Sequence, residues 1–225
     1  MKLIDLSTDF YGGMPKPPSA PEVVMKYAIT QSEKEEKEKG YSNKLEQFTI
    51  TTHVGTHFDA PSHFTAGGKN IDEFPLEMFY RVPTLVLHTE KEEYGEITVS
   101  DLEAAQRQGG SIQAGDFVIL NTGFYRFYQE EKYVRTPYLS WEAADYLACR
   151  NVSMVGIDSF TVDDVRRKEK PAHVRLLKEA GILIVECIVN LDKLSADRFF
   201  SCCFPIKVQN GSGGFTRLTA IFEEE

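Results

Sequence analysis

Hydrophobic residues along this chain gather in short runs that are bounded by glycine, proline or charged residues. Runs of this kind, rich in valine, isoleucine and phenylalanine, are typical of β-strands. One of them, Leu45–Val54, alternates apolar and polar residues and therefore predicts a half-buried strand. The predicted strands are Leu3–Ser7, Val23–Thr30, Leu45–Val54, Val82–His88, Asp116–Asn121, Val152–Asp158, Ile182–Val189, Phe199–Val208 and Arg217–Phe222.

Helix signals occur in three places between these runs. Ser100–Glu103 matches a capping box, which predicts a helix that stops near Gly109. Ser140–Cys149 begins with an N-cap serine, and Pro171–Gly181 has a proline suited to a first helical turn and a glycine at its end. Because the chain has no repeat and no low-complexity linker, the pattern predicts one strand-rich α/β domain over residues 1–225.

Three segments need a separate interpretation. Ser32–Lys44 is strongly charged, which indicates a solvated loop or an exposed helical turn, or alternatively a mobile lid beside a site. The aromatic stretch Phe124–Tyr128 either lines a pocket or subunit interface or packs beside a loop. Gly211–Gly214 precedes a predicted strand, so a tight turn is favoured over a phosphate-binding loop.

Composition narrows the partners and the compartment. The formal net charge of −9 argues against nucleic acid and against an anionic membrane surface. No apolar run approaches the ~20 residues of a membrane span. Four cysteines without C-x-x-C spacing predict free thiols in a reducing compartment. Since Met1–Leu6 has the pattern of a strand and not of a secretion signal, we expect a cytoplasmic protein.

The segment Thr51–His63 carries the densest chemistry of the chain. It holds three of the five histidines together with Asp59, and imidazole and carboxylate are ligands for Zn²⁺ or Mn²⁺. On one straight strand the Cα atoms of His53 and His57 would lie ~13 Å apart, too far to share an ion. We therefore predict that the chain turns at Gly55 and brings both histidines and Asp59 to one point. The alternative is a set of histidines satisfied by ordinary packing.

A second group of ligands is predicted further along the chain. Glu186 lies within an apolar run, where an unpaired carboxylate would cost several kcal/mol. A helix rising ~12 Å from His173 to Gly181, followed by a strand returning ~16 Å antiparallel to it, brings His173 level with Glu186. These two residues could instead form an ion pair or hydrogen bond of their own, or bond to Lys178. Five ligands suit a two-metal centre bridged by Asp59.

His63 is a histidine beyond this ligand set. We assign it general acid/base catalysis, and the alternative is a further metal ligand. His88, late in an apolar strand, is interpreted as structural.

The motif H-x-G-T-H-x-D-x-P-x-H in this segment resembles the signature of the cyclase family of metal-dependent hydrolases, which includes bacterial kynurenine formamidases and isatin hydrolases. The resemblance implies a swivelling β/β/α-type fold, a homodimer or larger homo-oligomer, and a centre of two Zn²⁺ ions, or of Mn²⁺ in some members. By motif position, His63 matches the catalytic histidine of the family. One ion would take His53, His57 and Asp59, and the other Asp59, His173 and Glu186. Further similar segments are Ile4–Ser7, Gly156–Ser159, Ala172–Glu186 and Gly211–Arg217.

Three departures from the family pattern concern the substrate and not the metal. Formamidases tend to carry Trp-Pro-Gly-Asp in an early loop, where this chain has Met14–Pro18. Val174 follows His173 where the family often has a second histidine, and a late Gly-Ser-Pro-type turn is replaced by Gly213–Phe215.

The predicted activity is hydrolysis of a C–N bond in a small-molecule carbonyl substrate. The leading substrate is an aryl formamide such as N-formylkynurenine, which belongs to tryptophan catabolism. The altered early loop favours a first alternative, the same chemistry on a lactam, lactone or other cyclic amide. A second alternative is a metal-binding protein without catalysis, against which His63 argues, since a histidine beyond the ligand set has little purpose there.

Overall fold

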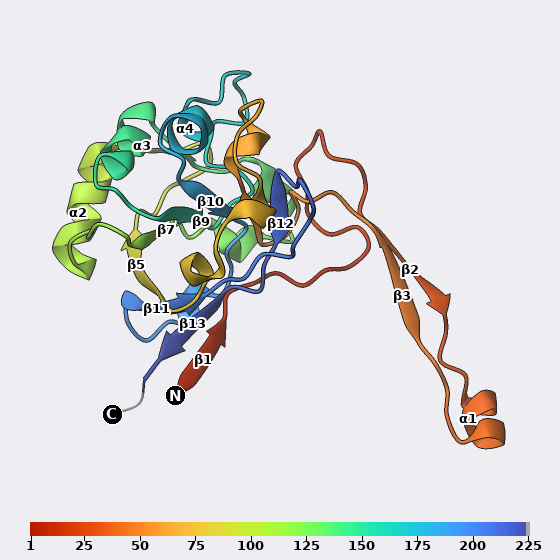
Figure 1. Ribbon diagram of the computed structural model, residues 1–225. Helices are drawn as coiled ribbons and strands as arrows, with labels where there is room; N and C mark the ends of the chain where they lie inside the picture. Colours follow the sequence, from red (N-terminus) through yellow and green to blue (C-terminus); the bar gives the residue numbers. More distant parts are fainter. Residues whose placement is uncertain (224–225) are drawn as a thin grey trace.

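The computed structural model describes residues 1–223, and its centre is a nine-stranded sheet (Figure 1). The central strands β5, β7, β9 and β10 run parallel, and the flanking strands pair antiparallel. The predicted α/β class is therefore confirmed. In spatial order the strands are β1 (Lys2–Asp5), β13 (Thr219–Phe222), β11 (Arg198–Cys202), β5 (Val82–His88), β7 (Phe117–Asn121), β9 (Met154–Ile157), β10 (Leu183–Glu186), β4 (His57–Asp59) and β12 (Gly213–Phe215).

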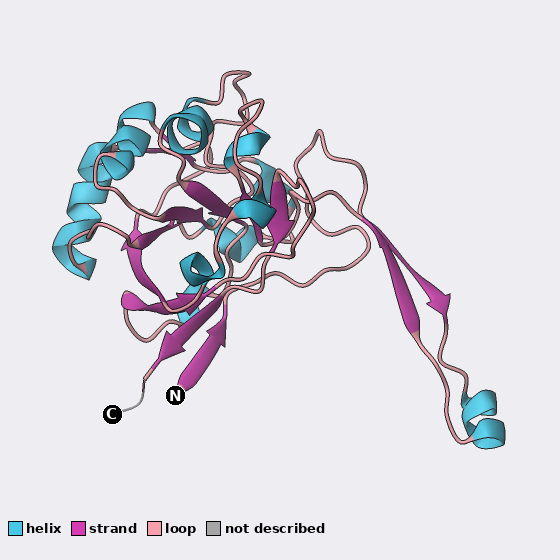
Figure 2. Ribbon diagram, viewed as in Figure 1, coloured by secondary structure: helices cyan, strands magenta, loops and turns pink. Residues whose placement is uncertain are grey.

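Helices cover one face of this sheet (Figure 2). They are α2 (Val99–Gly109), α3 (Trp141–Ala148) and α4 (Pro171–His173), which continues as a π-helical segment over Val174–Glu179. A short parallel ribbon, β6 (Glu96–Ile97) with β8 (Tyr138–Leu139), leads into α2 and α3.

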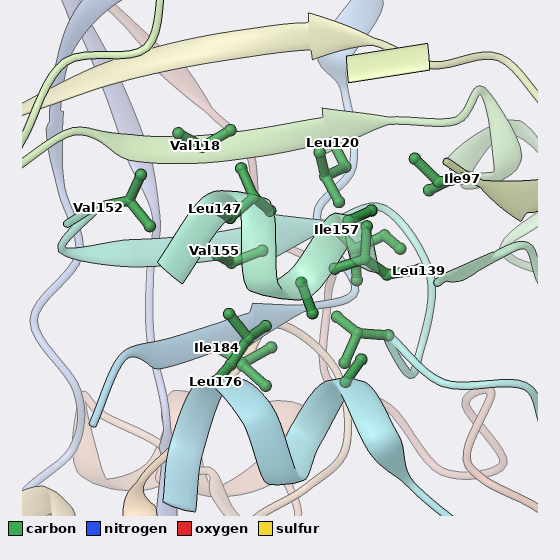
Figure 3. Packing of buried hydrophobic residues seen from close by; sticks show 14 of the residues in the cluster. Ile97, Val118, Leu120, Leu139, Leu147, Val152, Val155, Ile157, Leu176 and Ile184 are labelled. Atoms are coloured by element: carbon green, nitrogen blue, oxygen red, sulfur yellow. The ribbon is translucent and has the colours of Figure 1, made fainter. Parts of the chain in front are cut away.

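Side-chain alternation along the central strands builds a core on each face of the sheet. On β7, Val118 and Leu120 pack under the helices with Leu147 and Leu176, as Figure 3 shows. Ile119, between them, belongs to a second cluster. Because the middle strands are buried on both faces, they form a rigid base for the residues at their ends.

The helix signals were correct for α3 and for the helix that starts at Pro171, and displaced for α2. Ser140 caps α3 as predicted, and Gly181, with φ +68°, follows the π-helical segment. The N-cap of α2 is not Ser100 but Thr98, which exchanges hydrogen bonds with Asp101. Thr98 and Asp101 themselves satisfy the capping-box pattern, so the sequence offered two overlapping choices two residues apart.

Residues 24–49 form an arm that projects from the body (Figure 1). Strands β2 (Val24–Ile29) and β3 (Leu45–Thr49) pair antiparallel, and α1 (Glu33–Lys39) closes the hairpin at its outer end. The predicted half-buried strand over Leu45–Val54 is wrong, because the strand ends at Thr49 and is exposed on both faces where the arm stands clear of the body. The charged segment is an exposed helix, which is one of its two expected forms.

The C-terminal third departs from prediction in its details. Strands β11 and β13 are shorter than expected, and Gly213 and Gly214 lie in the edge strand β12 instead of a simple turn. A Cβ on Gly213 would lie 2.3 Å from the carbonyl oxygen of Phe58, so only glycine allows β12 to pair this closely with β4.

Several smaller expectations can also be compared with the structure. All four cysteines are free, and His88 forms a surface hydrogen bond with Asp197 at 2.8 Å. Phe124 and Tyr128 pack with Tyr133 in a small aromatic core, which supports the packing interpretation of that stretch. Within residues 1–223, no helix combines the length and apolar character needed to span a membrane.

Candidate metal centre

A sharp turn brings the histidines of the Thr51–His63 segment together, as predicted. Gly55 has φ +65°, and a Cβ there would lie 2.9 Å from Thr8 Oγ1, so a larger residue would be both strained and crowded. The turn leads into β4, whose central residue Phe58 is buried in the sheet core. Because side chains alternate on a strand, His57 and Asp59 point to the opposite face.

Asp59 lies at the centre of the cluster that results. Its Oδ1 is 2.6 Å from His53 Nδ1 and 3.3 Å from His57 Nε2, and its Oδ2 is 3.2 Å from His173 Nε2. The residue is 1% exposed, so these contacts lie out of bulk water. One carboxylate thus touches all three histidines that the sequence proposed as ligands.

Glu186 completes the cluster from β10, the antiparallel neighbour of β4. The register places Glu186 opposite His57, and Glu186 Oε2 lies 3.7 Å from His57 Nε2. Its Oε1 lies 3.4 Å from His173 Nε2, which confirms that the helix and the strand bring these two residues level. All five predicted ligands therefore converge. They form two groups, each with donor atoms within 4.8 Å of one another: His53, His57 and Asp59, and Asp59, His173 and Glu186.

Each of the three histidines has its other ring nitrogen held by a hydrogen bond. A proton on that nitrogen leaves the first nitrogen as a lone pair directed at the carboxylates, which is the tautomer a metal ligand needs. The contacts are His53 Nε2 to Ser212 Oγ (2.9 Å), His57 Nδ1 to the Gly55 carbonyl oxygen (2.7 Å) and His173 Nδ1 to Asp163 Oδ2 (2.5 Å).

Two buried atoms of the cluster test whether a metal fits. His57 Nε2 and Glu186 Oε1 are inaccessible to solvent and have no hydrogen-bond partner among the described residues. Buried polar atoms are rarely left unpaired, because each costs ~1–3 kcal/mol. Both atoms belong to the two groups of ligands, and a cation held there would satisfy them. The imidazole and carboxylate donors fit Zn²⁺ or Mn²⁺.

The electrostatics of the cluster also favour a cation. Burial opposes ionisation of Asp59, but hydrogen bonds from the histidines outweigh it and hold the pKa of Asp59 well below its usual value. Burial and the nearby Asp59 charge raise the pKa of Glu186. Burial disfavours the charged forms of His57 and His173. The carboxylates of Asp59 and Glu186 outweigh burial and raise the pKa of both rings, and Asp163 raises the pKa of His173 further. Without a metal, protons on the histidines balance the carboxylates, so we expect a divalent ion to replace those protons.

His63 lies beside the two ligand groups and belongs to neither. It follows Pro61 in a single 3₁₀ turn, and its ring stacks on His53 with centroids 3.9 Å apart. The His63 side chain is exposed, but desolvation and the neighbouring histidines lower its pKa, so its ring is neutral at pH 7. This placement suits the predicted acid/base role.

A cavity of about 510 Å³ opens onto the cluster. His53, Asp59, His63, His173 and Glu186 all line it. The remaining wall is largely apolar. Residues 17–20 form part of it, and they overlap Met14–Pro18, the stretch that departs from the formamidase pattern. No residue of the charged segment 32–44 reaches it, which argues against a lid over the cavity of the same chain.

Sequence reasoning missed Asp163, which positions His173. Its carboxylate accepts hydrogen bonds from the His173 ring and from the backbone N–H groups of Ala172 and His173. Asp163 is 1% exposed. The only signal in the sequence was an aspartate shortly before a candidate ligand histidine, which is too common to interpret alone. Ser212, which holds His53, was missed because it lies 159 residues further along the chain.

Replacing Asp163 by asparagine is expected to weaken metal binding by about 10–100-fold, because the amide no longer fixes the His173 tautomer. Metal affinity, measured by competition with a chromogenic chelator, is the readout. Asp164→Asn, next in the chain and paired with Arg166 outside the cluster, is the matched control. An unchanged metal affinity in Asp163→Asn would show that metal binding does not depend on the hydrogen bond between His173 and Asp163.

Three comparisons with known proteins point to one family. Residues 4–164 match the model of the Cyclase family, described as "Putative cyclase". A kynurenine formamidase of Geobacillus thermodenitrificans is 31% identical over 172 residues, covering 76% of this chain and 77% of the relative. Isatin hydrolase A from Labrenzia aggregata superposes with a TM-score of 0.84 and 25% identity over 99% of this chain and 94% of its own. A structure titled as a potential metal-dependent hydrolase with cyclase activity has a TM-score of 0.78 and 25% identity, covering 100% and 99%.

Proposed function

The chain belongs to the Cyclase family, and from this we propose that it is a metal-dependent hydrolase that cleaves the C–N bond of an aryl formamide, with N-formylkynurenine as the leading substrate. The observation that carries the proposal is the pair of ligand groups that share Asp59 at the floor of an apolar-walled cavity. Divalent ions held there would lower the pKa of a bound water and polarise the substrate carbonyl.

The chain's own residues account for the remaining requirements of hydrolysis. His63, neutral and beside the ligands, takes a proton from the attacking water and passes it to the departing amine. Stacking on His53 holds the His63 ring in place. Phe64 and Phe160 give the cavity flat apolar surfaces that suit an aromatic ring and exclude water.

A cyclic amide is the second candidate substrate, and the wall formed by Pro17 and Pro18 favours it. These prolines belong to Met14–Pro18, the stretch that corresponds to the early loop of formamidases, and they give the cavity a stiff apolar wall without a tryptophan. A compact, rigid ring such as isatin suits such a wall.

Elemental analysis followed by chelation and rescue tests the proposal. We expect the purified protein to contain a divalent metal, to lose activity with a chelator, and to regain it with Zn²⁺ or Mn²⁺. The same preparation is assayed on N-formylkynurenine, formanilide, isatin and a lactone, and formamides should be the better substrates. A fully active protein without metal would contradict the proposal, and activity on isatin alone would select the second candidate.

The number of ions and the location of the protein are also proposals. Two ions are favoured because Asp59 offers one oxygen to each ligand group. A cytoplasmic location is supported by the free state of all four cysteines, since disulfides persist mainly in oxidising compartments.

We further propose that the protein is a homodimer or larger homo-oligomer whose subunits meet through the arm. An isolated two-stranded hairpin is marginally stable in water, and this one exposes large apolar residues. A second copy is the favoured cover, because a neutral arm (five Glu, five Lys over residues 24–49) meets no strong repulsion from a chain of net charge −9. The exposed residues are Val24, Tyr27, Ile29, Tyr41, Leu45 and Phe48.

The double variant Tyr27→Ser/Phe48→Ser is expected to shift the protein toward the monomer, because both side chains lie on one face of the hairpin. Sedimentation velocity over a concentration series measures the change. Trp141→Ser, an exposed aromatic residue on α3, is the matched control and should leave the assembly unchanged. A wild-type protein that remains monomeric at every concentration would contradict the proposal.

A further inference from the structure

Lys170 is the only lysine or arginine among the residues that line the cavity of the cluster. It is half-buried and immediately precedes α4, three residues before the ligand His173. The two carboxylates that line the cavity, Asp59 and Glu186, are both engaged with the ligand histidines. Neither carboxylate is therefore available to pair with Lys170, whose ammonium group is the one lysine or arginine charge of the cavity wall.

Two neighbouring arginines are ion-paired, whereas Lys170 is not. Asp164 pairs through its carboxylate with Arg166 at 2.8 Å and with Arg167 at 3.5 Å. Lys170 Nζ donates instead to two backbone carbonyl oxygens, those of Asp164 and Arg167, each at 3.1 Å. Its ammonium group has three N–H donors, so one remains free. Within the described part of the chain it forms no ion pair.

These contacts also fix the position of the charge. A lysine on the surface usually samples many rotamers, and ordering it costs up to ~2 kcal/mol of side-chain entropy. Here the two carbonyl oxygens already hold the head group, so a ligand would meet a pre-positioned cation.

We propose that Lys170 binds a carboxylate on the substrate, which selects aryl formamides that carry an acidic side chain over neutral ones. This inference rests on the proposed function, and it adds a specificity residue to it. Phe64, Phe160 and Val165 line the same cavity as the cluster and Lys170, so its wall offers apolar surface for the aromatic ring of a substrate whose formamide reaches the cluster and whose carboxylate reaches Lys170. A small neutral ring such as isatin would leave the Lys170 charge unpaired.

A matched pair of substrates isolates the charge. N-formylkynurenine and its carboxamide differ only in the carboxylate, so their KM values compare acid and neutral binding directly. For Lys170→Gln, which keeps a side-chain donor but loses the charge, we expect KM for the acid to rise about tenfold with little change in kcat. KM for the carboxamide should stay unchanged. Lys170→Arg should retain the preference, and Lys168→Gln, an exposed lysine outside the cavity, is the control.

Calorimetric titration of the products, kynurenine and its carboxamide, provides a readout without turnover. The wild type should bind the acid more tightly, and Lys170→Gln should bind the two alike at unchanged metal content. An equal loss for acid and carboxamide, or no loss for either, would overturn the role of Lys170. If the wild type hydrolyses neither formamide, the proposed function fails, whereas activity with an unaltered acid preference in Lys170→Gln overturns this inference alone.

Discussion

Replacing Asp59 by alanine is expected to remove the bound metal and to abolish turnover together. Asp59 is the only residue that belongs to both ligand groups, with one oxygen facing His53 and His57 and the other facing His173. Loss of the bridge leaves each group with two donors, fewer than the three protein ligands of ordinary catalytic sites. We expect metal content to fall below detection by mass spectrometry and activity to fall to background.

The control for Asp59→Ala is another buried aspartate. Asp158 is fully buried, and burial raises its pKa to about 6, so Asp158→Asn removes a charge that burial already disfavours. It accepts hydrogen bonds from Thr122, outside the cluster, and the variant should keep its metal. Equal metal content in the wild type and in Asp59→Ala would contradict the bridging role. Circular dichroism of both variants excludes loss of metal through unfolding.

The ligand set could be predicted from sequence because its constraints are local or one-dimensional. Spacing alone required a turn at Gly55, and the structure has that turn. The length of one helix and one strand sufficed to bring His173 to Glu186, because α4 and its π-helical extension pack against the sheet through Leu176. An acidic residue within an apolar strand was an independent signal, since burial would be costly without a partner.

The parts that could not be predicted depend on which surfaces meet in three dimensions. The alternation in β3 predicts a buried face, but the arm carries that face away from the body, where no neighbouring element covers it. Asp163 acts through its distance to a ring and to two backbone N–H groups, and no spacing rule encodes those contacts. Lys170 was not distinguishable from the other cations of its loop until the structure showed that it lines the cavity and that Asp164 pairs with Arg166 and Arg167 instead.

Replacing His63 by alanine is expected to separate catalysis from metal binding. His63 lies outside both ligand groups and meets them through ring contacts with His53 and His173, so metal content should stay unchanged. Loss of a general acid/base group typically lowers turnover by about 10²–10⁴-fold. We expect kcat to fall within that range, with a smaller change in KM, because the walls that hold the substrate remain in place.

The matched control for His63→Ala is His88→Ala, since His88 is a histidine on the surface whose partner is Asp197. It should keep both metal and activity. Imidazole added to the assay should restore part of the turnover of His63→Ala, because a free base can enter the space that the side chain leaves. A loss of metal in His63→Ala would instead identify His63 as a further ligand, and the proton transfer would then need another residue of the cavity wall.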